Sequence, residues 1–189
     1  MKELQRFLDI IEEKNLSIED VIKLINGTKE FSKVKSEADE EITLAVDYRR
    51  NVKIMIKAGD YAKVDNELIY AYKRFYSPSV TRKKIETVIK LFHFSEEMLS
   101  DDVIKEIDKA GYIPGTLHDL LTLGEVYPYL QRQFPIIALG SVKRSQANVR
   151  QVPGLSITSR ERLLEVAYDG HEWKKDCRFI ALPKNAFSN

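Results

Sequence analysis

The clearest candidate for binding chemistry is a stretch without acidic residues. No Asp or Glu lies between Arg132 and Arg160, yet the stretch is rich in basic and polar side chains. A basic loop on a rigid scaffold can bind an anion or an acidic partner, because Arg makes charge-assisted hydrogen bonds with carboxylates and phosphates. With one aromatic residue added, the candidate binding residues are Lys143, Arg144, Arg150, Arg160, Arg162 and Trp173. The alternative is a loop that is solvated and binds nothing.

The second candidate is a thiol. Cys177 could act as a nucleophile if neighbouring cations lowered its pKa, and basic residues stand close to it in the sequence. His171 and Asp176 would then share a pocket with it, which makes an enzyme of unknown class the alternative function. Free cysteines are mostly buried packing residues, however, and no catalytic residue is assigned.

Metal and phosphate chemistry lack their usual patterns. The histidines are scattered at His93, His118 and His171, and no C-x-x-C or H-x-x-x-H motif occurs. The glycines fit neither the Walker motif nor the dinucleotide-binding motif. We therefore predict no metal and no cofactor.

Tyrosines interleaved with cations raise nucleic-acid binding as a further alternative. Residues 73–84 combine aromatic and basic side chains, and residues 143–150 add more cations. Bases stack on aromatic rings while cations hold phosphates. A solvated basic surface beside amphipathic core tyrosines explains the same residues, so nucleic acid is not the favoured partner.

Length and composition limit the number of domains, the class of partner and the compartment. The chain has 189 residues and a net charge of +1, which suits one domain plus an appendage and gives no overall attraction to nucleic acid or membranes. A single cysteine and an N-terminus without an apolar signal core indicate a cytoplasmic protein. No apolar run is long enough to span a bilayer.

Residues 1–36 should form a helical hairpin. Leu4, Phe7, Leu8 and Ile11 follow the helical spacing of one apolar stripe, and Ser17 starts a second helix that Gly27 ends. Such short helices need a surface to pack on, either their own domain or a second copy in a homodimer. The acidic balance of the segment opposes a DNA-reading helix-turn-helix. The stretch Phe31–Glu41 reads as a linker.

Residues 42–189 should form an α+β domain with a mostly antiparallel sheet. Strands are predicted at Ile42–Val46 and Ile85–Phe92, with a short helix between them that Gly59 ends. Ser100 caps the next helix, Gly111 ends it, and the chain turns at Tyr112–Pro114. The remaining predictions are a helix capped by Thr116 and Asp119, a buried strand at Phe134–Leu139, and strands at 151–157, 163–168 and 178–182.

Several of these motifs resemble those of a group of uncharacterised bacterial proteins. They include Met55–Tyr61, Leu91–Phe94, Gly111–Leu121, Gln131–Ser141 and Cys177–Ala181, and together they extend over about residues 42–185. This resemblance implies a bacterial source and brings no activity with it.

The C-terminal part, about residues 84–189, more remotely resembles the C-type lectin fold, which formylglycine-generating enzymes share. Phe134–Gly140 lies where those domains have their central buried strand, and Trp173 and Cys177 echo a closing Trp and Cys. The resemblance implies two helices packed on a mostly antiparallel sheet. Calcium-dependent sugar binding is not implied, because Lys174 and Lys175 stand where calcium ligands would be. The predicted function is thus a non-enzymatic binding module for an anionic or protein partner.

Overall fold

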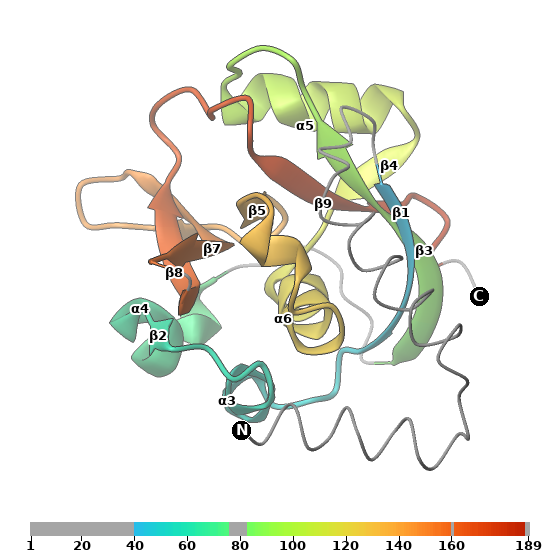
Figure 1. Cartoon of the computed structure of the whole chain (residues 1–189). Coiled ribbons are helices and arrows are strands. Elements are labelled where there is room, and N and C mark those ends of the chain that lie inside the picture. The colour runs from blue at the N-terminus through green and yellow to red at the C-terminus, as the bar shows by residue number, and fades with distance from the viewer. Residues whose placement is uncertain (1–39, 76–82, 160, 188–189) are drawn as a thin grey trace, which may run out of the picture. The chain divides into compact units, whose positions relative to one another are not determined.

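The computed structural model describes residues 40–75, 83–159 and 161–187 (Figure 1). All of them belong to residues 37–189, the second of two units into which the chain divides. The predicted helical hairpin at 1–36, the homodimer contact through it, and the candidate residue Arg160 lie outside the described residues.

The described domain is α+β, as predicted, and in it nine strands form one sheet. The strands are β1 (Glu40–Asp47), β2 (Lys63–Val64), β3 (Lys84–His93), β4 (Tyr112–Pro114), β5 (Ile136–Ile137), β6 (Lys143–Arg144), β7 (Arg150–Thr158), β8 (Glu161–Tyr168) and β9 (Arg178–Pro183). The α-helices are α3 (Val52–Ala58), α4 (Asn66–Tyr70), α5 (Ser100–Lys109) and α6 (Leu117–Val126). Two short 3-10 helices are η1 (Tyr72–Arg74) and η2 (Leu130–Arg132).

The sheet is mostly antiparallel, in the order β1-β3-β9-β5-β7-β8-β2. The pairs β5–β9 and β2–β8 are parallel, whereas the pairs that β1, β4, β6 and β7 make are antiparallel. The long strands β1 and β3 pair along the whole of β1, from Glu40 opposite Leu91 to Asp47 opposite Lys84. The strands predicted at Ile42–Val46, Ile85–Phe92, 151–157, 163–168 and 178–182 lie close to β1, β3, β7, β8 and β9.

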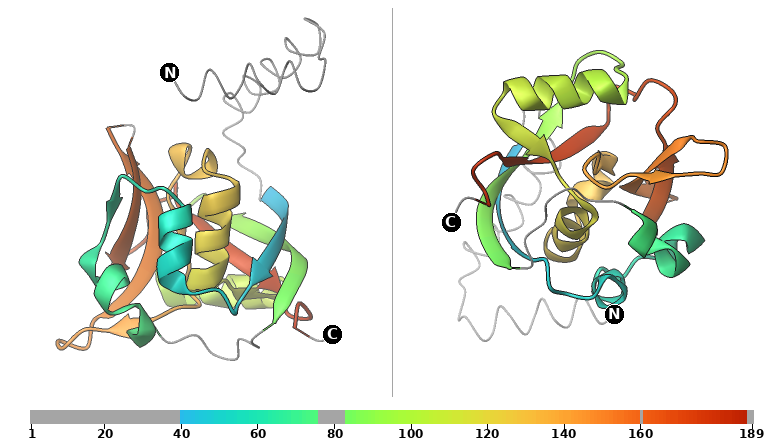
Figure 2. Two further views of the ribbon diagram at one scale, coloured as in Figure 1. Left: turned by 90° about the horizontal axis from the view of Figure 1, so that it is seen from below. Right: turned by 180° about the vertical axis from the view of Figure 1, so that it is seen from behind.

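Both faces of the sheet are covered by a helix. Successive strand residues point to opposite faces, so Ile180 packs with the α6 side while Phe179 and Ala181 pack with the α5 side. Figure 1 shows α6 lying between β1 and β3 on one side and β7 and β8 on the other. Figure 2 shows α3 running beside α6, which it contacts. This arrangement brings the start of α6 next to the loop that leads into α3.

The predicted cap of α6 is confirmed. The Thr116 hydroxyl and Asp119 carboxylate form a capping box, in which Asp119 accepts hydrogen bonds from the Thr116 backbone N–H at 2.6 Å and from its hydroxyl at 2.7 Å. The Leu117 N–H is satisfied by the Ser141 hydroxyl at 2.8 Å. The cap therefore sets where α6 begins and fixes the direction of its first turn.

Ser100 does not cap α5 as predicted. Leu99 holds the cap position, and Ser100 is the buried first residue of the helix. Its hydroxyl accepts a hydrogen bond of 2.6 Å from the Trp173 indole N–H. A buried indole N–H needs a hydrogen-bond acceptor, and the Ser100 hydroxyl serves as that acceptor instead of capping the helix.

The predicted turn at Tyr112–Pro114 is the strand β4, which pairs with β9. The turn lies before it, at Ala110 and Gly111, and the Gly111 φ of 87° suits glycine. The predicted strand at Phe134–Leu139 is buried at Phe134, Ile136, Ile137, Ala138 and Leu139, but only Ile136–Ile137 form a ladder. Pro135 has no N–H for the ladder, and the chain turns at Leu139 and Gly140.

The elements between Tyr61 and Phe75 were not predicted. Asp65 caps α4 by accepting a hydrogen bond of 2.8 Å from the Glu67 N–H, and β2 exists through its pairing with β8. Elements this short carry little periodic signal. Within the described residues, none of the helices combines the length and the apolar character needed to cross a membrane.

Candidate functional site

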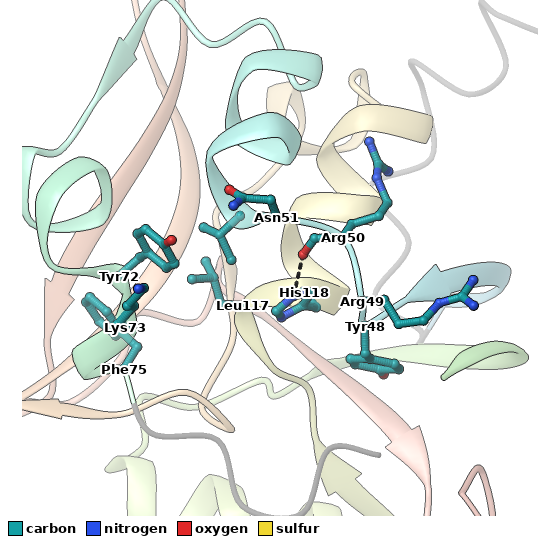
Figure 3. Close-up of a pocket in the computed structure, with 10 residues that line it drawn as sticks. Tyr48, Arg49, Arg50, Asn51, Tyr72, Lys73, Phe75, Leu117 and His118 are labelled. Carbon is teal, nitrogen blue, oxygen red and sulfur yellow. Dashed lines mark hydrogen bonds between the residues drawn. The ribbon is translucent and has the colours of Figure 1, made fainter. Parts of the chain in front are cut away.

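A pocket of about 730 Å³ lies where the β1–α3 loop, η1 and the start of α6 meet (Figure 3). This volume is in the range of small-molecule sites, roughly 300–1,000 Å³. Its lining residues are Tyr48, Arg49, Arg50, Asn51, Val52, Tyr72, Lys73, Phe75, Leu117 and His118. None of these ten side chains is a carboxylate.

The capping residues of α6 hold Tyr48 in place. Its hydroxyl donates a hydrogen bond to Asp119, 71 positions away in the chain. Burial raises the pKa of Asp119, although hydrogen bonds from Tyr48 and Thr116 favour its ionised form. The Tyr48 ring also packs against the His118 ring at 5.7 Å between centroids. The network that starts α6 thus holds this wall of the pocket in place.

His118 ties the first turn of α6 to the β1–α3 loop. Its Nε2 lies 3.3 Å from the Arg50 carbonyl oxygen, so Nε2 carries the proton and donates it (Figure 3). The histidine that the sequence left without a role is therefore part of the pocket wall.

The two arginines of the loop are bound to carboxylates of the same chain. Arg49 makes two hydrogen bonds of 2.8 Å to Asp47, and Arg50 makes two to Glu125 at 2.7 and 3.2 Å. The hydrogen bond from the Arg49 side chain holds the pKa of Asp47 far below its ordinary value. Figure 3 shows both guanidinium groups turned away from Tyr72 and Lys73. Their stems and backbone line the pocket while their charges face elsewhere.

The opposite wall consists of Tyr72, Lys73 and Phe75 (Figure 3). Phe75 is buried, Tyr72 is half-buried and packs against the core, and Lys73 is exposed. Lys73 makes no hydrogen bond or ion pair with the described part of the chain. Buried Val52 and Leu117 complete an apolar floor. The site can accordingly receive an apolar group and hold an acidic one, and the described residues contain no cluster of metal ligands.

The residues predicted to bind a ligand lie elsewhere and mostly serve the fold. Lys143 is buried and pairs with Glu67 on α4. Arg150 bridges Asp101 and Asp169, with 2.8 Å to each. Arg144 is exposed and donates to the Asn148 side chain at 3.2 Å.

Arg162 and Trp173 are both buried. Arg162 donates to the backbone carbonyls of Gly59 and Gly124 and to the Gln131 side chain. Trp173 is 5% exposed and donates to Ser100. The structure does not bring these two residues or the three basic-loop residues to the pocket, because strand pairing directs them to other neighbours.

Cys177 is buried, and its surroundings do not activate it. Burial, followed by the nearby Asp176 charge, raises the pKa of the thiol to about 11, so it stays protonated at neutral pH. His171 is exposed and packs against the Trp173 ring at 5.9 Å between centroids. This geometry does not favour the enzyme alternative.

The pocket residues come from segments that the sequence linked to other roles. Tyr72 and Lys73 belong to the aromatic and basic stretch considered for nucleic acid, and Tyr48 stands next to a charged loop. In the sequence, the sign of this pocket is the cluster of aromatic and basic residues around Tyr72 and Lys73. No sequence pattern links that cluster to the start of α6.

No family model matches the chain, and neither a curated protein nor a solved structure shows significant similarity to it. The resemblances to uncharacterised bacterial proteins and to the C-type lectin fold stay predictions.

Proposed function

We propose that this protein is a non-enzymatic binding module and that the pocket beside α3 holds an acidic group of its partner. The observation that carries the proposal is the lining itself. No lining residue is a carboxylate, the exposed cation Lys73 is paired with no carboxylate of the described residues, and the floor is apolar. A concave site with a few convergent polar groups on an apolar floor is the usual form of a ligand site.

We infer the non-enzymatic character from the side chains that line the pocket. The pocket lining includes no serine, threonine, cysteine or carboxylate that could attack a substrate or take its proton. His118 holds its Nε2–H on the Arg50 carbonyl oxygen, and the lining offers its ring no serine, threonine or cysteine to activate. The buried thiol of Cys177, the alternative nucleophile, has a raised pKa.

A lectin-like arrangement of residues 84–189 belongs to the same proposal. It is supported by the order of elements, in which α5 ends before Gly111, the capped α6 follows, and the buried β5 comes next. The first and last strands of that region, β3 and β9, also pair with each other. We place the protein in the cytoplasm because its single cysteine is buried and unpaired.

Titration of isotope-labelled protein with anionic probes tests the function. We expect benzoate, inorganic phosphate, citrate or a hexaglutamate peptide to shift the backbone amide signals of residues 48–52, 72–74 and 117–118. Lys73→Glu should abolish the shifts, because the variant places a carboxylate in the pocket. Lys57→Glu is the matched control, since Lys57 is an exposed lysine of α3 outside the pocket. If no probe shifts these signals in the parent protein, the proposal is wrong.

A further inference from the structure

The charge that a ligand can carry depends on how many cations of the pocket are not already paired with a carboxylate of the chain. Arg49 and Arg50 each place two donors on a carboxylate of their own chain. A bidentate pair of this kind occupies one edge of the guanidinium and offsets its charge with a carboxylate. Both side chains also point away from the η1 wall (Figure 3).

His118 directs its Nε2–H to the Arg50 carbonyl oxygen, so a ligand does not have that donor. Asn51 uses its amide oxygen to accept from the Lys53 N–H at 2.9 Å, which leaves only its neutral NH₂ group as a donor. Lys73 is therefore the cation that remains for a ligand among the described lining residues.

The rest of the lining is apolar or aromatic. Val52, Phe75 and Leu117 are 5%, 7% and 4% exposed, and the rings of Tyr48 and Tyr72 stand on opposite sides of the pocket. Burying an apolar group here removes its surface from water, which favours binding. A group with more than one charge would leave a charge unpaired against this floor, which is costly.

We propose that the pocket takes a monoanion in which one carboxylate is joined to an aromatic or branched apolar body. This inference rests on the proposed function and narrows it to a ligand class. Lys73 pairs with the carboxylate, and Tyr72, Phe75 and Leu117 receive the apolar body. The chemistry is the same whether the carboxylate belongs to a free acid or to the C-terminus of a peptide. A phosphodiester chain fits less well, because it needs several free cations.

Calorimetric titration with matched probes tests the ligand class. The probes are 3-phenylpropionate, propionate with the charge alone, 3-phenylpropanol with the ring alone, and phenyl phosphate with a second charge. We expect 3-phenylpropionate to bind about tenfold or more tightly than each of the others, because it alone has both an apolar body and a single charge. N-acetylphenylalanine and its amide form the peptide arm: tighter binding of N-acetylphenylalanine than of 3-phenylpropionate indicates a peptide end, and the reverse indicates a free acid.

Substitutions in the pocket test which residues contact the carboxylate of the ligand and which contact its apolar body. Lys73→Met should weaken 3-phenylpropionate about tenfold without changing the affinity for 3-phenylpropanol, whereas Lys57→Met should change neither. Tyr72→Ala should weaken both ring-bearing probes and spare propionate, and thermal unfolding verifies that it is folded. Tighter binding of phenyl phosphate or of propionate than of 3-phenylpropionate overturns the ligand class while the binding function stands. The binding function itself fails if none of the anionic probes in the titration of isotope-labelled protein shifts the pocket signals.

Discussion

The guanidinium of Arg162 lies over the Tyr61 ring, with its central carbon 4.9 Å from the ring centroid. The same group donates to the Gly59 carbonyl at 2.6 Å, to the Gly124 carbonyl at 2.5 Å and to the Gln131 side chain at 3.0 Å. Arg162 is 8% exposed, and burial lowers its pKa. A residue expected to contact a ligand is instead a buried hub that joins the end of α3, the end of α6 and η2.

Replacing Arg162 should therefore cost stability. We expect Arg162→Lys to lower the free energy of unfolding by about 2–4 kcal/mol, because an ammonium on a flexible stem cannot serve three acceptors and stack on a ring. Urea denaturation measures the loss. Arg144→Lys, at an exposed position, should change stability by less than about 0.5 kcal/mol. Equal losses in the two variants would contradict the assignment.

Gly124 makes room for Tyr61. A Cβ at Gly124 would lie 2.2 Å from the Tyr61 hydroxyl oxygen, so Gly124→Ala should destabilise the protein by about 1–3 kcal/mol. Tyr61→Phe alone should be neutral or stabilising, because that buried oxygen has no hydrogen-bond partner among the described residues. In the Tyr61→Phe background the alanine should cost less, since its next neighbour is a Leu155 methyl group at 3.1 Å. Additive costs in this double-mutant cycle would refute the coupling.

Ser100 should act through Trp173 rather than as a helix cap. Ser100→Ala leaves the buried indole N–H without its acceptor and should cost about 1–2 kcal/mol. In a Trp173→Phe background the same substitution should cost little, because phenylalanine has no N–H to satisfy. Chemical denaturation of the four proteins gives the coupling energy. A cap role predicts the same cost in both backgrounds.

The Cys177 thiol should be protected from reagents, and its ionisation should lower the free energy of unfolding at alkaline pH. With a folded-state pKa of about 11 against an ordinary 9.0, the thiol favours the protonated folded form. Its contribution is complete below pH 9.0 and is lost as the pH rises toward about 11. We expect slow reaction with a disulfide reagent at pH 8 until denaturant unfolds the chain. Cys177→Ala should remove the part of the alkaline stability loss that this thiol causes, and fast reaction of the native protein would contradict the burial argument.

The sequence by itself determined the parts of the domain that depend on neighbours along the chain. Thr116 and Asp119 specify the start of α6 because a capping box needs only residues three apart. Apolar patterns located β1, β3, β7, β8 and β9 because strand periodicity is local. The α+β class follows from their order.

Tertiary structure alone decided which side chains meet. Tyr48, Tyr72 and His118 line one pocket because α3 packs beside α6 and a hydrogen bond joins Tyr48 to Asp119 across 71 positions. Packing likewise turned Arg162 from a candidate ligand contact into a buried hub. The types of these residues are visible in the sequence, but a buried donor takes whichever acceptor the fold places beside it. That choice depends on contacts between distant segments, so it could be seen only in the folded chain.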